Sequence, residues 1–199
     1  METEEIREKK EPKRLPVWAC ILLFALGLFV CMGLYGTIGF GLLSLILGDE
    51  ARHPGLLVYT VTEASMLLSV LTPAVILLYF ERRPFSDLGL TLKGHVRGLW
   101  YGLLVAMLLY LIGFGLSLAI GEVEVTGFQF DPLNLLGTFV FCLLVALTEE
   151  IMMRGYILGR LLHTRMNKFL ALFVSALLFA LLHIFNPNVA FLPMLNLVI

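Results

Sequence analysis

Long, mainly apolar runs dominate the pattern of hydrophobic and polar positions along this chain. Such runs are present at residues 15–48, 55–80, 98–121, 131–162 and 169–185. Because a helix needs about 20 mainly apolar residues to cross the hydrocarbon of a bilayer, each run predicts a membrane-spanning helix. Their spacing by short polar loops predicts an all-α, polytopic membrane protein with five full transmembrane helices.

The two ends of the chain need separate interpretation. Residues 1–14 form a charged tail, and the run after them is too long for a signal-peptide core, so we expect it to be retained. Residues 188–199 are apolar but too short to span, and Asn186–Pro187 before them predicts a helix break. We expect a sixth helix to start here in a sequence that is truncated. The predicted parts are a tail (1–14), N-terminal helices (15–128) and a C-terminal core (129–199).

Two further segments have a predicted structural role. The glycines of the first run are expected to let helix backbones approach closely; they are Gly33, Gly36, Gly39 and Gly41. Residues 84–102 mix proline, glycine and charge, which is typical either of a short interfacial element or of an ordinary loop.

Charge alternates between successive loops. Basic residues gather in the N-terminal tail, in loop 81–97 and in segment 154–168, whereas loops 49–53 and 120–131 are mainly acidic. Basic loops mark the cytoplasmic side of a membrane protein. The alternation predicts five crossings of the plasma membrane with a cytoplasmic N-terminus.

Composition supports a membrane location and excludes one class of partner. The chain of 199 residues is 59% hydrophobic and 15% charged, with a mean hydropathy of +0.93. A net charge of −1 provides no basic excess to neutralise phosphates, which argues against nucleic-acid binding. The three cysteines all lie in apolar runs, without metal-ligand spacing, and are interpreted as structural thiols.

Glu149 and Glu150 interrupt the fourth run and are the strongest functional signal. Arg154 is four residues after Glu150, so the two side chains share a helical face and can form an ion pair. Glu149 is rotated by about 100° and is free to face another element. Two carboxylates in a site of low dielectric cannot both stay charged without partners. The arrangement indicates one structural carboxylate and one general base.

His183 on the next run is the predicted partner. If the fourth and fifth runs form a hairpin that turns at residues 163–168, Glu150 and His183 lie about 18 Å and 22 Å from the turn, at 1.5 Å per residue. A carboxylate and an imidazole at similar depth fit the activation of a water molecule. Phe179 is expected to shape the site or to pack. Asn186 is expected to orient His183, to bind a substrate carbonyl, or to cap the helix.

Other chemistries remain open at this stage. No cofactor is expected, although Glu149, Glu150 and His183 are a set that a divalent metal would use. Glu63 in the second run is more typical of helix–helix hydrogen bonding, but with Glu150 it also suits a proton-coupled transporter.

The paired motifs resemble a known family. Glu149-Glu150-x-x-x-Arg154, followed by Phe179-x-x-x-His183, is similar to the first two motifs of the CPBP family of CAAX-prenyl-protease and bacteriocin-processing (Abi) membrane proteins, and FALLHIFNPN resembles its bacterial members. The resemblance covers about residues 130–199. It implies an intramembrane endopeptidase in which Glu149 is the base and His183 its partner. The resemblance further implies that Glu150 and Arg154 organise the site. It also implies that the substrate is a peptide or protein at the membrane and that the protein is embedded in the lipid bilayer.

One departure from the family pattern keeps an alternative open. The family has a third motif, His-x-x-x-Asn/Asp, on a later helix, and no histidine follows His183 in this sequence. Either the truncation expected above removed this motif, or the chain as given is catalytically incomplete and inactive. The alternative is a non-catalytic membrane protein that acts in bacteriocin self-immunity or as a scaffold.

Overall fold

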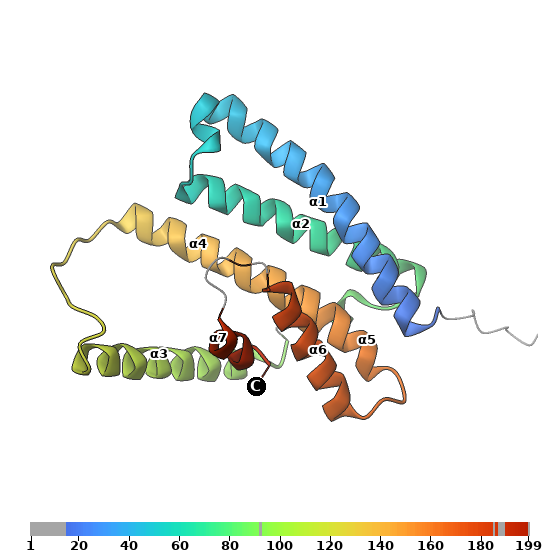
Figure 1. Cartoon of the computed structure of the whole chain (residues 1–199). Helices are drawn as coiled ribbons and strands as arrows, with labels where there is room; N and C mark the ends of the chain where they lie inside the picture. Colours follow the sequence, from blue (N-terminus) through green and yellow to red (C-terminus); the bar gives the residue numbers. More distant parts are fainter. Residues whose placement is uncertain (1–14, 92, 185, 187–189, 199) are drawn as a thin grey trace, which may run out of the picture.

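The structure, a computed structural model, describes residues 15–91, 93–184, 186 and 190–198. Every regular element in these residues is a helix (Figure 1). In chain order they are α1 (Val17–Leu47), the 3₁₀ turn η1 (Gly48–Arg52), α2 (Leu56–Phe80), the 3₁₀ turn η2 (Phe85–Leu88), α3 (Val96–Ala119), α4 (Pro132–Glu149), the π-helix η3 (Glu150–Leu158), α5 (Gly159–Leu162), α6 (Lys168–Leu182) and α7 (Phe191–Asn196).

The all-helical, multi-pass prediction is confirmed, but the number of spans is not. Within the described residues, four segments are long and apolar enough to cross a membrane: Val17–Arg52, Leu56–Phe80, Val96–Ala119 and Pro132–Leu162. The predicted fifth span is α6, which is apolar but has only 15 residues. The predicted start of a sixth contains α7, a helix of six residues. The count of five spans and a sixth therefore stays a prediction.

α1 and α2 pack as an antiparallel pair along most of their length (Figure 1). Gly27, which was not among the four predicted glycines, approaches α2 closely, because a Cβ there would lie 2.8 Å from Pro73 Cβ. Of the four predicted glycines, Gly39 makes a close approach, since a Cβ there would lie 2.4 Å from Ser65 Oγ. The other three glycines have open space around them, so the prediction of a glycine-rich contact is wrong for them. α1 is continuous through all four because a single glycine costs a helix only about 1 kcal/mol.

The loops that are rich in basic residues meet at one end of the bundle. The first turns of α1, the end of α2 and α5 come together there through hydrogen bonds and ion pairs that join Cys20, Glu81 and Arg160. At the opposite end the start of α2 lies against α4, where a Cβ on Gly137 would be 2.7 Å from Leu56. Among the described residues, the structure thus puts the basic segments 81–97 and 154–168 at the same end as the start of α1.

Tyr156 of η3 lies at the centre of the core. Its ring stacks on Phe24 of α1 with centroids 4.3 Å apart, and its hydroxyl donates to the Cys20 main-chain oxygen over 3.4 Å. Val70 and Ala74 of α2 belong to the same fully buried cluster. Burying an aromatic side chain of this size contributes about 1.5–3 kcal/mol, so Tyr156 ties three helices together.

A chain of charged side chains closes this core at the basic end. Arg160 Nη1 lies 2.5 Å from Glu81 Oε2, and the two side chains are only 5% and 10% exposed. Arg83 adds contacts of 3.6 Å to Glu81 and 3.4 Å to Asp87, and the Cys20 thiol donates to Glu81 Oε1 over 2.8 Å. The guanidinium of Arg160 also stands 5.1 Å from the Tyr156 ring centroid, within cation–π range.

The predicted interfacial segment is anchored rather than loose. Residues Phe85–Leu88 form η2, and Leu88 is buried against η3. This approach requires Gly155, since a Cβ there would lie 2.7 Å from the Leu88 carbonyl oxygen. η2 therefore braces η3 from the side that faces away from α6.

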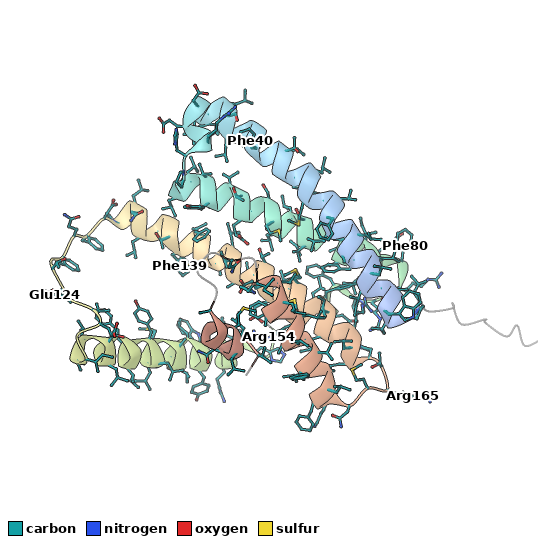
Figure 2. All side chains as sticks on the ribbon, viewed as in Figure 1. Phe40, Phe80, Glu124, Phe139, Arg154 and Arg165 are labelled. Atoms are coloured by element: carbon teal, nitrogen blue, oxygen red, sulfur yellow. The ribbon has the colours of Figure 1, made fainter. Side chains whose placement is uncertain are left out.

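α3 stands apart from this assembly. It has no buried residue, and its side chains project without neighbours in Figure 2. An apolar helix with this exposure fits a lipid environment, where no internal burial is required.

Gly155→Ala should destabilise the protein, because the added methyl group meets backbone rather than a movable side chain. We expect a loss of about 1–3 kcal/mol, seen as a lower thermal midpoint in detergent. Gly113→Ala on α3 is the control, since nothing lies within 4 Å of its Cβ position. Equal midpoints for the two variants would contradict the close contact with η2.

Glu81→Gln should be strongly destabilising because it leaves the buried Arg160 without its counter-charge. Breaking a buried ion pair costs about 3–5 kcal/mol, whereas replacing both partners by apolar residues is often neutral. The double variant Glu81→Met/Arg160→Met should therefore regain most of the lost thermal midpoint. Glu124→Gln, at an exposed loop acid, is the control and should change nothing measurable.

Candidate functional site

The helix that carries the acidic pair has a clear local origin. Asp131 caps α4 by accepting hydrogen bonds from the N–H groups of Leu133 and Asn134, and Pro132 occupies the first helical position. As predicted, the helix continues past Glu150 and ends at the 163–168 turn. The acidic pair consequently lies near the middle of a segment of 31 residues.

The helix changes type at the acidic pair, which was not predicted. Residues Glu150–Leu158 form a π-helix, whose turns are wider than those of an α-helix. π-Helical turns are rare and occur often at functional sites. No sequence pattern used above distinguishes such a stretch from an ordinary α-helix.

Glu149 faces α6, where it meets His183. Its Oε1 lies 3.5 Å from His183 Nε2, with the two side chains 38% and 23% exposed. The hairpin between η3 and α6 therefore brings these residues together, as the depth comparison predicted. Phe179, one turn before His183, packs edge-on against the imidazole with ring centroids 4.5 Å apart.

The contact made by the second imidazole nitrogen determines which ring nitrogen of His183 carries the hydrogen. His183 Nδ1 lies 2.8 Å from the Phe179 main-chain oxygen, and a carbonyl oxygen can only accept, so Nδ1 carries the hydrogen. In the neutral ring Nε2 is then an acceptor and faces another acceptor, Glu149 Oε1. A proton held between the two atoms would satisfy both, as would a water molecule that donates to each of them after a small separation of the side chains.

Glu150 has a different partner. It forms an ion pair with Arg154, four residues on, and both side chains are about half exposed or more. The two carboxylates have different partners, as predicted: Glu150 faces the Arg154 guanidinium, and Glu149 faces the His183 imidazole. Their catalytic roles stay a prediction.

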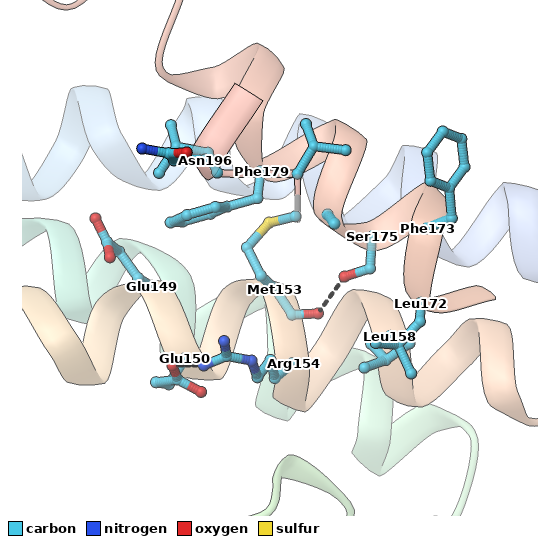
Figure 3. A pocket seen from close by; sticks show the side chains of 13 residues that line it. Glu149, Glu150, Met153, Arg154, Leu158, Leu172, Phe173, Ser175, Phe179 and Asn196 are labelled. Atoms are coloured by element: carbon cyan, nitrogen blue, oxygen red, sulfur yellow. Dashed lines mark hydrogen bonds and ion pairs between the residues drawn. The ribbon is translucent and has the colours of Figure 1, made fainter. Parts of the chain in front are cut away.

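A cavity of about 380 Å³ opens between η3, α6 and α7 (Figure 3). Its polar lining consists of Glu149, Glu150, Arg154, Ser175 and Asn196. Its apolar lining includes Met153, Leu158, Leu172, Phe173 and Phe179. In Figure 3 Glu149 lies toward one end, and Leu158, Leu172 and Phe173 lie toward the other. The cavity thus combines acidic and apolar regions, as a site for an amphipathic ligand would.

Several sequence predictions fall outside this cavity. His183 contacts Glu149 without being one of the lining residues, and Glu63 on α2 is not part of the lining either. Asn186 is exposed, and its main-chain N–H donates to the His183 oxygen over 3.0 Å. The neighbouring Pro187 lies outside the described residues.

Two polar lining residues, Ser175 and Asn196, were missed by sequence reasoning, as were the apolar ones other than Phe179. Ser175 is one turn before Phe179 on α6, and this spacing could have indicated it. Asn196 gives no such signal, because α7 reaches the cavity only through the tertiary fold.

The described residues contain no group of three or more histidine, cysteine, aspartate or glutamate side chains placed to hold a metal ion. Glu150 faces Arg154 and so does not join Glu149 and His183 in one ligand set. A metal on all three residues would need a rearrangement of η3.

One comparison with known proteins gave a match. Residues 131–199 match the family model of Rce1-like type II CAAX prenyl endopeptidases. The match begins at the N-cap of α4 and includes η3, α6 and α7, which together build the cavity. The resemblance to the CAAX-protease family is confirmed for this segment. Searches of curated proteins and of solved structures found no match to the chain.

The C-terminal part of the chain is therefore similar to type II CAAX prenyl endopeptidases. The four apolar spans indicate a multi-pass membrane protein.

Proposed function

We propose that this protein is an intramembrane endopeptidase that hydrolyses a peptide bond with a water molecule activated by Glu149 and His183. The observation that carries the proposal is the 3.5 Å approach of Glu149 Oε1 and His183 Nε2 beside a cavity in the Rce1-like segment. A carboxylate and an imidazole in contact within an apolar span are the components of general base catalysis.

In the proposed reaction the water lies between the two side chains. Glu149 takes its proton while the hydroxide adds to the scissile carbonyl carbon. The carbon–nitrogen bond then breaks, and the proton passes to the leaving amine nitrogen, from Glu149 or through His183. Arg154 keeps Glu150 paired, so that one negative charge rather than two faces the substrate.

We further propose a substrate of the CAAX type, with the scissile bond at the acidic end of the cavity and an apolar group at the Phe173 end. The support is the family named in the match and the apolar lining from η3 and α6. The substrate would reach the cavity from the bilayer, since the surrounding helices are apolar.

Glu149→Gln and His183→Ala should each lower cleavage of a farnesylated CAAX peptide by at least about 100-fold, the usual contribution of a general base. The assay is product release from purified protein in lipid vesicles, followed by mass spectrometry. Glu122→Gln, in the loop before α4, is the matched control and should retain full activity.

The same assay separates the alternatives. Loss of activity on chelation would favour a metal held by Glu149 and His183 over the glutamate mechanism. If the farnesylated peptide is not cleaved, the peptide termini produced by proteolysis are identified in two sets of membranes. One set contains the wild-type protein and the other contains the Glu149→Gln variant. An identical set of termini, with any phenotype intact in the variant, would favour the non-catalytic immunity or scaffold function.

We also propose that the basic end of the bundle faces the cytoplasm of a plasma membrane, with the N-terminus on that side. The support is the meeting of the 81–97 and 154–168 segments, both basic, at the end of the bundle where α1 begins. With Cys20, Cys31 and Cys142 replaced by serine, Arg165→Cys should be protected from an impermeant maleimide in intact cells, and Glu124→Cys should be labelled. The reverse pattern would invert the topology.

A further inference from the structure

Ser175 of α6 bonds differently from most serine and threonine side chains of the spanning helices, although Thr72 also pairs across helices, with the Tyr35 hydroxyl over 3.0 Å. Seven of these donate to the carbonyl four residues earlier in their own helix, over 2.7–2.9 Å: Thr37, Ser44, Thr60, Thr62, Ser65, Ser69 and Thr148. Ser175 instead donates across to the main-chain oxygen of Met153 in η3, over 3.4 Å. A hydroxyl bond of normal strength is about 2.7–2.8 Å long, so Ser175 is weakly held.

This hydroxyl also faces the candidate site. Ser175 is 6% exposed and lines the same cavity as Glu149, and Figure 3 shows its bond to the Met153 oxygen at the cavity wall. A buried polar side chain normally has a well-made hydrogen bond, because leaving it unpaired costs about 1–3 kcal/mol. A weakly bonded hydroxyl at a cavity wall can change partner at small cost.

A peptide bound in this cavity needs such partners. Its main-chain N–H and C=O groups leave water when they enter a site within the membrane, and each must be satisfied there. Glu149, Glu150 and Arg154 already have charged or imidazole partners. The neutral polar side chains of the lining are Ser175 on α6 and Asn196 on α7. Asn196 has both a donor and an acceptor in its amide.

We propose that Ser175 and Asn196 bind the main chain of the peptide substrate, with the Ser175 hydroxyl turning from the Met153 oxygen to a substrate carbonyl. This inference rests on the proposed endopeptidase function and assigns the residues that hold the substrate beside Glu149. Ser175 and Asn196 would hold the chain from two different helices, and the scissile bond would be presented to the Glu149–His183 pair.

The test uses the full protein and the farnesylated CAAX peptide, or a peptide recovered from the comparison of membrane termini. Ser175→Ala should raise KM by roughly three- to ten-fold, the effect of one neutral hydrogen bond, with little change in kcat. Asn196→Leu, which keeps the size of the side chain, should do the same. Ser69→Ala is the matched control, because Ser69 is equally buried but bonds only within α2 and lies outside this cavity.

A modified substrate separates binding from a merely structural effect. In a set of peptides, each main-chain amide away from the scissile bond is replaced in turn by an alkene, which cannot accept a hydrogen bond. For the wild-type protein, the peptide whose alkene replaces the amide bonded by Ser175 should show a KM raised as much as the Ser175→Ala substitution raises it. For the Ser175→Ala variant, the same peptide should show no further rise in KM. Should Ser175→Ala fail to accumulate, Ser175→Cys keeps the volume and weakens the donor.

The outcomes distinguish the two proposals. If no peptide is cleaved in a manner that depends on Glu149, the endopeptidase function is wrong, and this inference is wrong with it. If cleavage is present but KM is unchanged in Ser175→Ala, or if the alkene and alanine effects simply add, the substrate-binding inference alone is overturned.

Discussion

The buried ion pair between Arg160 and Glu81 is the interaction on which the arrangement of this protein depends. Both side chains lie in a region almost free of solvent, where a charge without a partner is strongly unfavourable. Arg160 comes two residues before the end of the helical segment that carries the acidic pair, and Glu81 directly follows α2. Their contact fixes the position of that segment along α2. Cys20, Arg83 and Asp87 extend the same set of contacts to α1 and to η2.

This constraint is transmitted to the candidate site through η3. Tyr156 is held between Phe24 and Arg160, and Gly155 allows η2 to close on the opposite side. With η3 fixed, the short turn at residues 163–168 returns the chain as α6. His183 then arrives opposite Glu149, and Ser175 opposite Met153. The site is thus built on packed helices rather than on loops, which suits a reaction that needs constant geometry.

Sequence reasoning located the main components of the site because each has a short-range signature. The four-residue spacing predicts the Glu150–Arg154 pair from helix geometry alone. The distance from a common turn predicts the level of His183, since helical rise is constant. The same reasoning could not find Asn196 or the Glu81–Arg160 pair. Those contacts join residues far apart in the chain, and no local pattern records which helices become neighbours.

The sequence by itself determined the helical, membrane-spanning character of the chain and the pairing of Glu150 with Arg154. Each of these follows from hydropathy, charge and helical period, which are local properties. Only the tertiary structure decided that α6 is a short helix, that the helix type changes at Glu150, and that Ser175 and Asn196 line one cavity with Glu149. Those features depend on packing between distant segments, where small residues such as Gly155 and buried charges such as Glu81 select one arrangement.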